Sequence, residues 1–274
     1  MEIDLSISTD LVSNLLARFI KSEVTRAGFA RGLVALSGGL DSSLVCYLAA
    51  RALGAENVLA VRMPYKTSSP DSLEHADVVI EDLGIPSVTI PITEMADGLI
   101  AQEDEMSNVR RGNVLARCRM VVVYDQSEVF GGLVIGTSNK TEILLGYSTL
   151  YGDSASAINP VGDLYKTQVR QLARAVGVPE PIIAKPPSAD LWVGQTDEGE
   201  LGFTYEQVDR LLYLLVDQRF SPDECEQAGF KPDFIAAVVQ RIRRSHFKRI
   251  MPPVAKITSR TFGYDFLYLR DWGT

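Results

Sequence analysis

One segment near the start of the chain has the residue types of a phosphate-binding loop. The sequence SGGLDSS at residues 37–43 lies between a short apolar run and a helix-like stretch. Consecutive glycines let the backbone turn tightly and approach a ligand without obstruction by a Cβ atom. The first turn of the following helix offers unpaired N–H groups and a partial positive charge, which favour phosphate. We therefore expect a phosphate-bearing ligand at this loop.

The acidic residue of the loop points to a metal ion as well. Two anions repel each other, so Asp41 is best explained by a divalent cation that lies between its carboxylate and the phosphate. The loop matches neither the Walker A pattern, because no Lys-Ser or Lys-Thr closes it, nor the dinucleotide GxGxxG pattern. The simpler alternative is a serine-capped turn between a strand and a helix, which is common in α/β proteins.

The loop is embedded in a regular alternation of short apolar runs and helical patterns. We expect strands at residues 32–36, 58–63, 88–90 and 133–135, and helices at residues 44–52, 73–83 and 113–129. Such an alternation indicates a parallel sheet that is covered by helices on both faces. The sequence therefore predicts an α/β fold with a doubly wound, Rossmann-like parallel sheet of about five strands.

Beyond about residue 152 the pattern becomes helical. Helices are expected at residues 166–176, 205–216 and 232–246, separated by loops rich in proline and glycine. We expect residues 1–274 to form a single domain, with an α/β core at about 30–165 and a helical C-terminal part at about 166–250. A first helix, capped by residues 8–10, is expected to present Leu11, Leu15, Phe19 and Ile20 on one apolar face.

The composition excludes several classes of protein. The 274 residues are 46% hydrophobic and 23% charged, which is typical of a globular protein, and the net charge of −8 lacks the basic footprint of a general nucleic-acid binder. Three widely separated cysteines argue against a disulfide framework or a structural zinc site. No apolar run is long enough to span a bilayer, and Glu2 and Asp4 occupy the place of a basic signal region. We expect a cytoplasmic protein without nucleic-acid or membrane partners.

The loop SGGLDSS resembles the pyrophosphate-binding loop of the ATP pyrophosphatases. Later segments narrow the resemblance: NVLARCRM at 113–120, GTSNKTE at 136–142 with Gly152-Asp153, GDLYKTQ at 162–168, and KPPSADL at 185–191 with GQTDEG at 194–199. In order and spacing these motifs closely resemble the NAD synthetase family, from the first helix to residues 247–249. The resemblance implies an adenine nucleotide alpha-hydrolase-like fold.

The resemblance also implies a reaction. Enzymes of this family are ligases that amidate deamido-NAD (nicotinic acid adenine dinucleotide) to NAD in the last step of NAD biosynthesis. ATP first adenylates the carboxylate, ammonia then attacks, and AMP and pyrophosphate leave. Two alternatives remain open: another ATP pyrophosphatase, such as a tRNA-thiolating or amidotransferase synthetase subunit, and a non-catalytic nucleotide-binding module.

Site residues follow from the family motifs, position by position. The resemblance assigns ATP binding to Ser37, Gly38, Gly39, Leu40, Asp41, Ser42, Thr137, Lys166 and Ser188. It assigns Mg²⁺ to Asp41 and Glu142, deamido-NAD to Arg117 and Lys248, and the catalytic roles to Asp41 and Lys166. Without the resemblance, each assigned residue outside the 37–43 loop would be interpreted as an ordinary solvated or loop residue.

The chain departs from the better-known bacterial pattern at two positions. Where some members carry a substrate-binding Lys and Asp, Leu150 and Ala157 stand here, and neither makes a polar side-chain contact. Asp153 is a possible substitute. His75 and His246 have no spacing that suggests metal binding or acid–base chemistry.

Three further expectations concern assembly and access. The helix at 113–129 is apolar throughout 120–124, and the resemblance places it between the subunits of a homodimer; a central core helix fits the pattern equally well. Residues 188–202, with Trp192, are expected to form a mobile lid. Ammonia is expected as nitrogen donor, because the motifs leave no room for a glutaminase domain, although a separate glutaminase subunit remains possible.

Overall fold

A parallel sheet forms the centre of the molecule. The computed structural model describes residues 3–103, 105–192 and 194–265. Strands β1 (Arg31–Ala35), β2 (Val58–Arg62), β3 (Ser87–Thr89) and β4 (Gly132–Ile135) are all parallel, in the order β3-β2-β1-β4. An isolated parallel bridge between Ile135 and Ile158 stands in place of a further strand. The parallel sheet is confirmed, with four strands in the described residues rather than about five.

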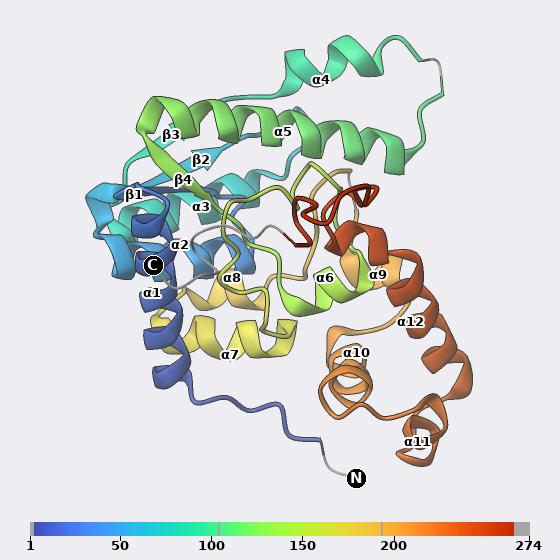
Figure 1. Ribbon diagram of the computed structural model, residues 1–274. Coiled ribbons are helices and arrows are strands. Elements are labelled where there is room, and N and C mark those ends of the chain that lie inside the picture. The colour runs from blue at the N-terminus through green and yellow to red at the C-terminus, as the bar shows by residue number, and fades with distance from the viewer. Residues whose placement is uncertain (1–2, 104, 193, 266–274) are drawn as a thin grey trace.

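Helices connect and surround these strands (Figure 1). The first half of the chain contains α1 (Thr9–Arg26), α2 (Leu40–Leu53), α3 (Pro70–Leu83), α4 (Thr93–Ile100) and α5 (Asn108–Phe130). The second half contains α6 (Lys140–Leu145), α7 (Lys166–Val176), α8 (Glu180–Ala184), α9 (Asp197–Leu201), α10 (Tyr205–Leu212), α11 (Pro222–Gln227) and α12 (Pro232–Arg244). Short 3₁₀ turns occur at Ala55–Asn57 and His246–Arg249, and a π-helical turn at Tyr213–Asp217 extends α10. None of the described helices has the length and apolarity of a bilayer span.

The side chains of the strands alternate between two hydrophobic cores. Val34 and Ala60 face a core shared with α1, α2 and α7, whereas Leu33 and Val61 face a core shared with α4 and α5. Figure 1 shows these two helical layers on opposite sides of the sheet. The doubly wound arrangement predicted from the alternating pattern is therefore confirmed.

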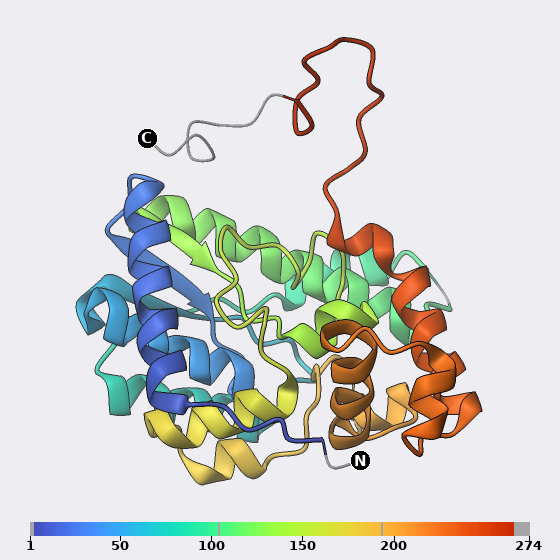
Figure 2. The same ribbon diagram turned by 60° about the horizontal axis from the view of Figure 1, so that its bottom comes forward.

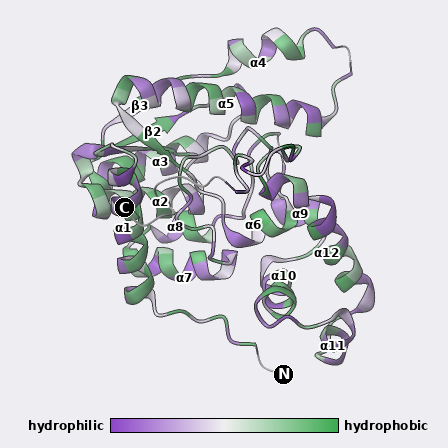
Figure 3. Ribbon diagram, in the orientation of Figure 1, coloured by the Kyte–Doolittle hydropathy of each residue, from purple (hydrophilic) through white to green (hydrophobic). Residues whose placement is uncertain are grey.

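The helical C-terminal part has its own core. Tyr205, Leu211 and Val238 are almost completely buried where α6, α10 and α12 meet. Hydrophobic and hydrophilic residues alternate along α5 and α7, as expected for helices with one buried face (Figure 3). After the last helical turn, residues 250–265 extend from the body as an arm, on which Met251 and Ile257 are 81% and 90% exposed (Figure 2).

The first helix is rotated relative to the sequence prediction. Ile20 is buried as expected, but Leu11 and Leu15 are 65% and 58% exposed. The buried face instead contains Leu16 and Val24, spaced around Ile20 at helical intervals, and packs against α2 and α7. The prediction was wrong because α1 has more apolar residues than one face holds, and its neighbours determine which of them are covered.

We predict that Gly38→Ala destabilises the protein through a specific clash. Gly38 has φ +74°, and a Cβ atom there would lie 1.9 Å from the Ser72 carbonyl oxygen at the start of α3. Gly28 is the matched control, because it has φ +85° and a Cβ atom there would meet no heavy atom within 4 Å. Gly28→Ala should show only the left-handed backbone cost of about 1–2 kcal/mol, and Gly38→Ala about 1–3 kcal/mol more.

Urea unfolding followed by circular dichroism measures both free energies. Equal losses for the two variants would show that the loop does not depend on its close approach to α3.

Candidate active site

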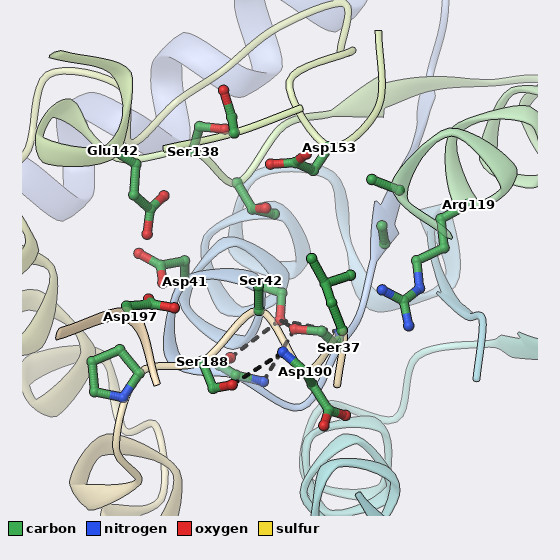
Figure 4. Close-up of a pocket in the computed structure, with 18 of the residues that line it drawn as sticks. Ser37, Asp41, Ser42, Arg119, Ser138, Glu142, Asp153, Ser188, Asp190 and Asp197 are labelled. Carbon is green, nitrogen blue, oxygen red and sulfur yellow. Dashed lines mark hydrogen bonds between the residues drawn. The ribbon is translucent and has the colours of Figure 1, made fainter. Parts of the chain in front are cut away.

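The carboxyl ends of β1 and β4 define the position of the site. Strands β2 and β3 lie on one side of β1 and β4 lies on the other, so the strand order reverses between β1 and β4. Ligands of open α/β sheets bind in the crevice at such a switch point. A cavity of about 800 Å³ opens there, and it is lined by the loop after β1, the segment after β4 and parts of α5, α7 and the 185–200 segment (Figure 4).

The predicted phosphate loop is held in shape by its own hydroxyl groups. The backbone N–H of Ser37 donates to Ser42 Oγ at 3.2 Å, and the two side-chain oxygens lie 3.0 Å apart. Ser43 Oγ donates to the Gly39 carbonyl at 2.8 Å, while Leu40, the first residue of α2, is buried in the core. The loop therefore presents the N-terminus of α2 to the cavity from a fixed position.

Three residues that are far apart in the sequence form one charged cluster. Lys166 Nζ lies 2.5 Å from Asp41 Oδ2 and 3.1 Å from Glu142 Oε1, so the ammonium group bridges both carboxylates. The cluster joins α2, α6 and α7. Asn139 fixes the carboxylates further: its Nδ2 donates to Asp41 Oδ1 at 2.9 Å, and it forms a capping box with Glu142 at the start of α6.

Burial and neighbouring charges act in opposite directions on this cluster. Burial alone would lower the pKa of Lys166, but Asp41 and Glu142 raise it above its ordinary value, so the lysine is a cation. Burial raises the pKa of Glu142, and Lys166 opposes this change. Burial also raises the pKa of Asp197, which accepts hydrogen bonds from Tyr205 at 3.0 Å and Tyr147 at 3.1 Å.

The two predicted metal ligands face the cavity together. Asp41 and Glu142 offer hard carboxylate oxygens within reach of one ammonium group, which is the donor type that Mg²⁺ prefers. Within residues 3–103, 105–192 and 194–265, no group of three or more His, Cys, Asp or Glu side chains is arranged to hold a metal ion. Two carboxylates alone would leave most coordination positions of such a cation to water or to a bound ligand.

The other predicted residues divide into two groups. Thr137, Ser188 and Lys248 line the cavity, and Lys248 Nζ donates to the carbonyls of Gly146 at 2.8 Å and Ser148 at 2.5 Å. Arg117 does not belong to the lining. Its guanidinium donates to the Leu150 carbonyl at 3.3 Å on another side of α5.

Arg119 is a cavity residue that the sequence analysis did not assign. It extends from α5 toward the cavity, and its Nε donates to the Met63 carbonyl at 3.1 Å (Figure 4). Burial lowers the pKa of Arg119 from its ordinary value. The signal was present in the sequence, because Gly112, Ala116 and Arg119 have helical spacing and share the cavity face, whereas Arg117 falls outside it.

Asp153 and Asp197 also line the cavity. Asp153 accepts the backbone N–H of Thr149 at 2.7 Å, and burial raises the pKa of its carboxyl group. Asp197 lies in the motif GQTDEG, which carried the family resemblance without assigning any role to this aspartate. Its two tyrosine partners, Tyr205 and Tyr147, lie 8 and 50 positions away in the sequence, so no short motif contains the whole group.

The segment expected to form a lid lies against the cavity in this structure. Asp190 accepts hydrogen bonds from Ser69 N at 3.0 Å and Ser72 Oγ at 3.2 Å, at the start of α3. On the other side, a Cβ atom at Gly112 of α5 would lie 2.8 Å from Leu191 and 3.6 Å from Trp192. Trp192 therefore lies beside α5. The mobility of the segment stays a prediction.

Fold and site together define a class: an α/β protein with a nucleotide-type phosphate loop and a buried carboxylate–lysine cluster at the switch point of its sheet. The model of the NAD synthase family matches residues 12–252. The chain is 55% identical over 269 residues to the NH(3)-dependent NAD(+) synthetase of Trichlorobacter lovleyi, covering 98% of each chain. It is 53% identical to the protein of the same name from Chlorobaculum tepidum, covering 96% of this chain and 95% of the relative.

Two solved structures are similar to this chain along most of its length. The NH3-dependent NAD synthetase of Campylobacter jejuni superposes with a TM-score of 0.78 at 35% identity, over 91% of this chain and all of that one. The NMN synthetase of Francisella tularensis superposes with a TM-score of 0.81 at 30% identity, over 92% of this chain and all of that one. The chain belongs to the NAD synthase family.

We predict that Lys166→Met is strongly destabilising. The variant leaves the carboxylates of Asp41 and Glu142 buried beside each other without a cation, which should lower the free energy of unfolding by about 3–5 kcal/mol. Adding Glu142→Gln should restore part of the loss, because it removes one of the uncompensated charges. Lys21→Met, on the exposed side of α1, is the control and should change stability by less than about 0.5 kcal/mol.

Chemical unfolding of the four proteins provides the comparison. A Lys166→Met variant as stable as the Lys21→Met control would mean that the cluster does not depend on the ammonium group.

Proposed function

We propose that this protein catalyses the ATP-dependent amidation of deamido-NAD to NAD with ammonia, by way of an adenylated carboxylate, with release of AMP and pyrophosphate. One observation carries the proposal: Lys166 bridges Asp41 and Glu142 beside the phosphate loop. The match to the NAD synthase family along nearly the whole chain supports it. The same match favours this reaction over the two alternatives, another ATP pyrophosphatase or a non-catalytic nucleotide-binding module.

ATP is proposed to bind with its phosphates at the loop. The backbone of Gly38, Gly39 and Leu40 and the hydroxyls of Ser37 and Ser42 surround the N-terminus of α2, which favours anions. Thr137 and Ser188, which both line the cavity, would supply further hydroxyl groups. Lys166 would donate from its ammonium group to a phosphate oxygen. Mg²⁺ held by Asp41 and Glu142 would supply charge neutralisation on the phosphates.

The chemistry requires positioning more than a protein nucleophile. A free carboxylate is a poor electrophile, and transfer of AMP converts it to a mixed anhydride that ammonia attacks at the carbonyl carbon. The chain has to align the carboxylate with the α-phosphate and to stabilise the negative charge that develops there. The segment at residues 188–202, which contacts α3 and α5, would keep water from the adenylate.

Deamido-NAD is proposed to occupy the remaining part of the cavity. The family resemblance assigns Arg117 and Lys248 to it, and the cavity adds Arg119 as a cation that faces the same space. Leu150 and Ala157 contribute no charged group, but the Leu150 carbonyl holds Arg117. Asp153 also lines the cavity and interacts electrostatically with both Lys248 and Arg119.

Ammonia is proposed as the nitrogen donor. This chain aligns with 98% and 95% of the lengths of the two relatives named NH(3)-dependent NAD(+) synthetase. Glutamine hydrolysis needs an activated thiolate, whereas Cys46 and Cys225 are buried, and burial raises the pKa of both thiols. Among the described residues, no cysteine lines the cavity.

The principal experiment follows NAD by mass spectrometry. Wild-type protein with deamido-NAD, ATP, Mg²⁺ and ammonium chloride should form NAD, AMP and pyrophosphate in equal amounts, and glutamine should replace ammonium poorly. Asp41→Asn and Glu142→Gln should each lower kcat by about 10²-fold, because both remove a charge beside the phosphates. Glu180→Gln, an exposed carboxylate paired with Arg174, is the control and should leave kcat unchanged.

Several outcomes would contradict the proposal. Absence of NAD under these conditions would overturn the function, and near-normal rates of both variants would overturn the metal assignment. Nicotinic acid mononucleotide is tested in parallel, because one solved neighbour is named NMN synthetase. A clear preference for the mononucleotide would change the substrate while retaining the reaction.

We further propose that this single-domain, cytoplasmic protein is a homodimer that uses α5 as part of its interface. Val121 and Tyr124 of α5 are 52% and 40% exposed, although the middle of this helix is apolar, so the helix is covered on one side only. Light scattering at micromolar concentration should give twice the chain mass of 30.1 kDa. Val121→Asp should shift the protein toward the monomer, and a monomeric wild type would contradict the assembly.

A further inference from the structure

Asp209 is a fully buried carboxylate that lies outside the cavity. It belongs to α10 in the helical part of the chain, has no exposed surface, and is absent from the cavity lining. Among the described residues, no lysine or arginine forms an ion pair with it; its partners are an O–H and an N–H group. Burying a carboxylate is costly unless it is fully hydrogen-bonded, so this position calls for an explanation.

The contacts of Asp209 lead directly to the charged cluster. Its Oδ1 accepts the hydroxyl of Thr141 at 2.6 Å, and its Oδ2 accepts the backbone N–H of Thr167 at 2.8 Å. The hydroxyl oxygen of Thr141 in turn accepts the backbone N–H of Lys166 at 3.0 Å. Thr141 is itself completely buried. Asp209 and Thr141 therefore hold the first two amides of α7.

These two amides have no partners within their own helix. The first N–H groups of an α-helix lack intrahelical acceptors, and the N-terminus of a helix favours a negative charge. A lysine at this position adds a positive charge to the positive end of the helix. Asp209 brings a negative charge to this end of the helix through its hydrogen bond with the Thr167 amide. Asp41 and Glu142 compensate the ammonium group of Lys166 in the cavity.

The same hydrogen bonds set the spacing between two site residues. Thr141 directly precedes Glu142 in α6, and Thr167 directly follows Lys166 in α7. A single carboxylate from α10 bonds to both neighbours, so a movement of α6 relative to α7 would break one of its hydrogen bonds. The distance between the Glu142 carboxylate and the Lys166 ammonium group depends on this connection.

We propose that Asp209 and Thr141 are positioning residues that fix Lys166 and Glu142 relative to each other for reaction with ATP. The proposal rests on the proposed function and extends it to two residues that touch no substrate. It also assigns the helical part a role in the chemistry, because α10 holds the start of α7 in register with the α/β core.

The test uses one pair of variants that differ by a single hydroxyl group. Thr141→Val has nearly the shape of threonine but lacks the hydroxyl, and Thr141→Ser retains it. Thr141→Val should lower kcat at least tenfold at saturating substrates, with KM for deamido-NAD unchanged within twofold, whereas Thr141→Ser should keep at least half of the wild-type kcat. Asp209→Asn, which loses the charge and one acceptor, should resemble Thr141→Val.

A control separates positioning from general loss of stability. Ser221 caps α11 in a capping box away from the cavity. Ser221→Ala should lower the melting temperature without lowering kcat. A folded Thr141→Val or Asp209→Asn variant with kcat within twofold of wild type would overturn the proposal, as would a Thr141→Ser variant as impaired as Thr141→Val.

Hydrogen exchange of the wild-type protein tests the connection without any activity measurement. First-turn amides of helices ordinarily exchange fast, but Lys166 and Thr167 should exchange slowly because Thr141 and Asp209 hold them. Fast exchange at both amides would overturn the proposal even if NAD is formed. Slow exchange together with absence of NAD formation would locate the failure in the proposed function instead.

Discussion

The site depends on one interaction, the ion pairing of the Lys166 ammonium group with two carboxylates. This group joins Asp41 of α2 and Glu142 of α6 to the start of α7, and it is almost completely buried. Each of the three charges would be costly to bury alone, and they are tolerated because they compensate one another. The three helices thus have to pack in one arrangement, since any other would leave a charge in the interior without its partner.

The sheet provides the place where this arrangement is possible. Reversal of strand order between β1 and β4 separates the connections that follow them, and a crevice opens between the two strand ends. Asp41 follows β1 and Glu142 follows β4, each within the first turn of the next helix. The helical part also borders the crevice. Its first helix, α7, begins with Lys166, and Asp209 of α10 accepts a hydrogen bond from the next amide, that of Thr167.

Much of the fold and part of the site were predictable from local sequence patterns. The strands, the phosphate loop and the helix that begins at Lys166 follow from periodicity, glycine placement and the family motifs. The covered face of α1 was mispredicted, and Arg119 was passed over beside Arg117, because orientation about a helix axis depends on what packs against it. The hydrogen bond from Thr141 to Asp209 joins residues 68 positions apart, so no local pattern contains it.

The charge balance of the cavity bears on how a polyphosphate enters. Asp41, Glu142 and Asp197 stand together at one end, and Lys166 is the cation that faces all three. Adding the phosphates of ATP to this end brings more negative charge than one ammonium group compensates, and burial strengthens the repulsion. If Lys166 turns to the phosphates, the carboxylates lose their partner. A divalent cation held by Asp41 and Glu142 would resolve both conflicts, because its charge would compensate the two carboxylates and the phosphates together.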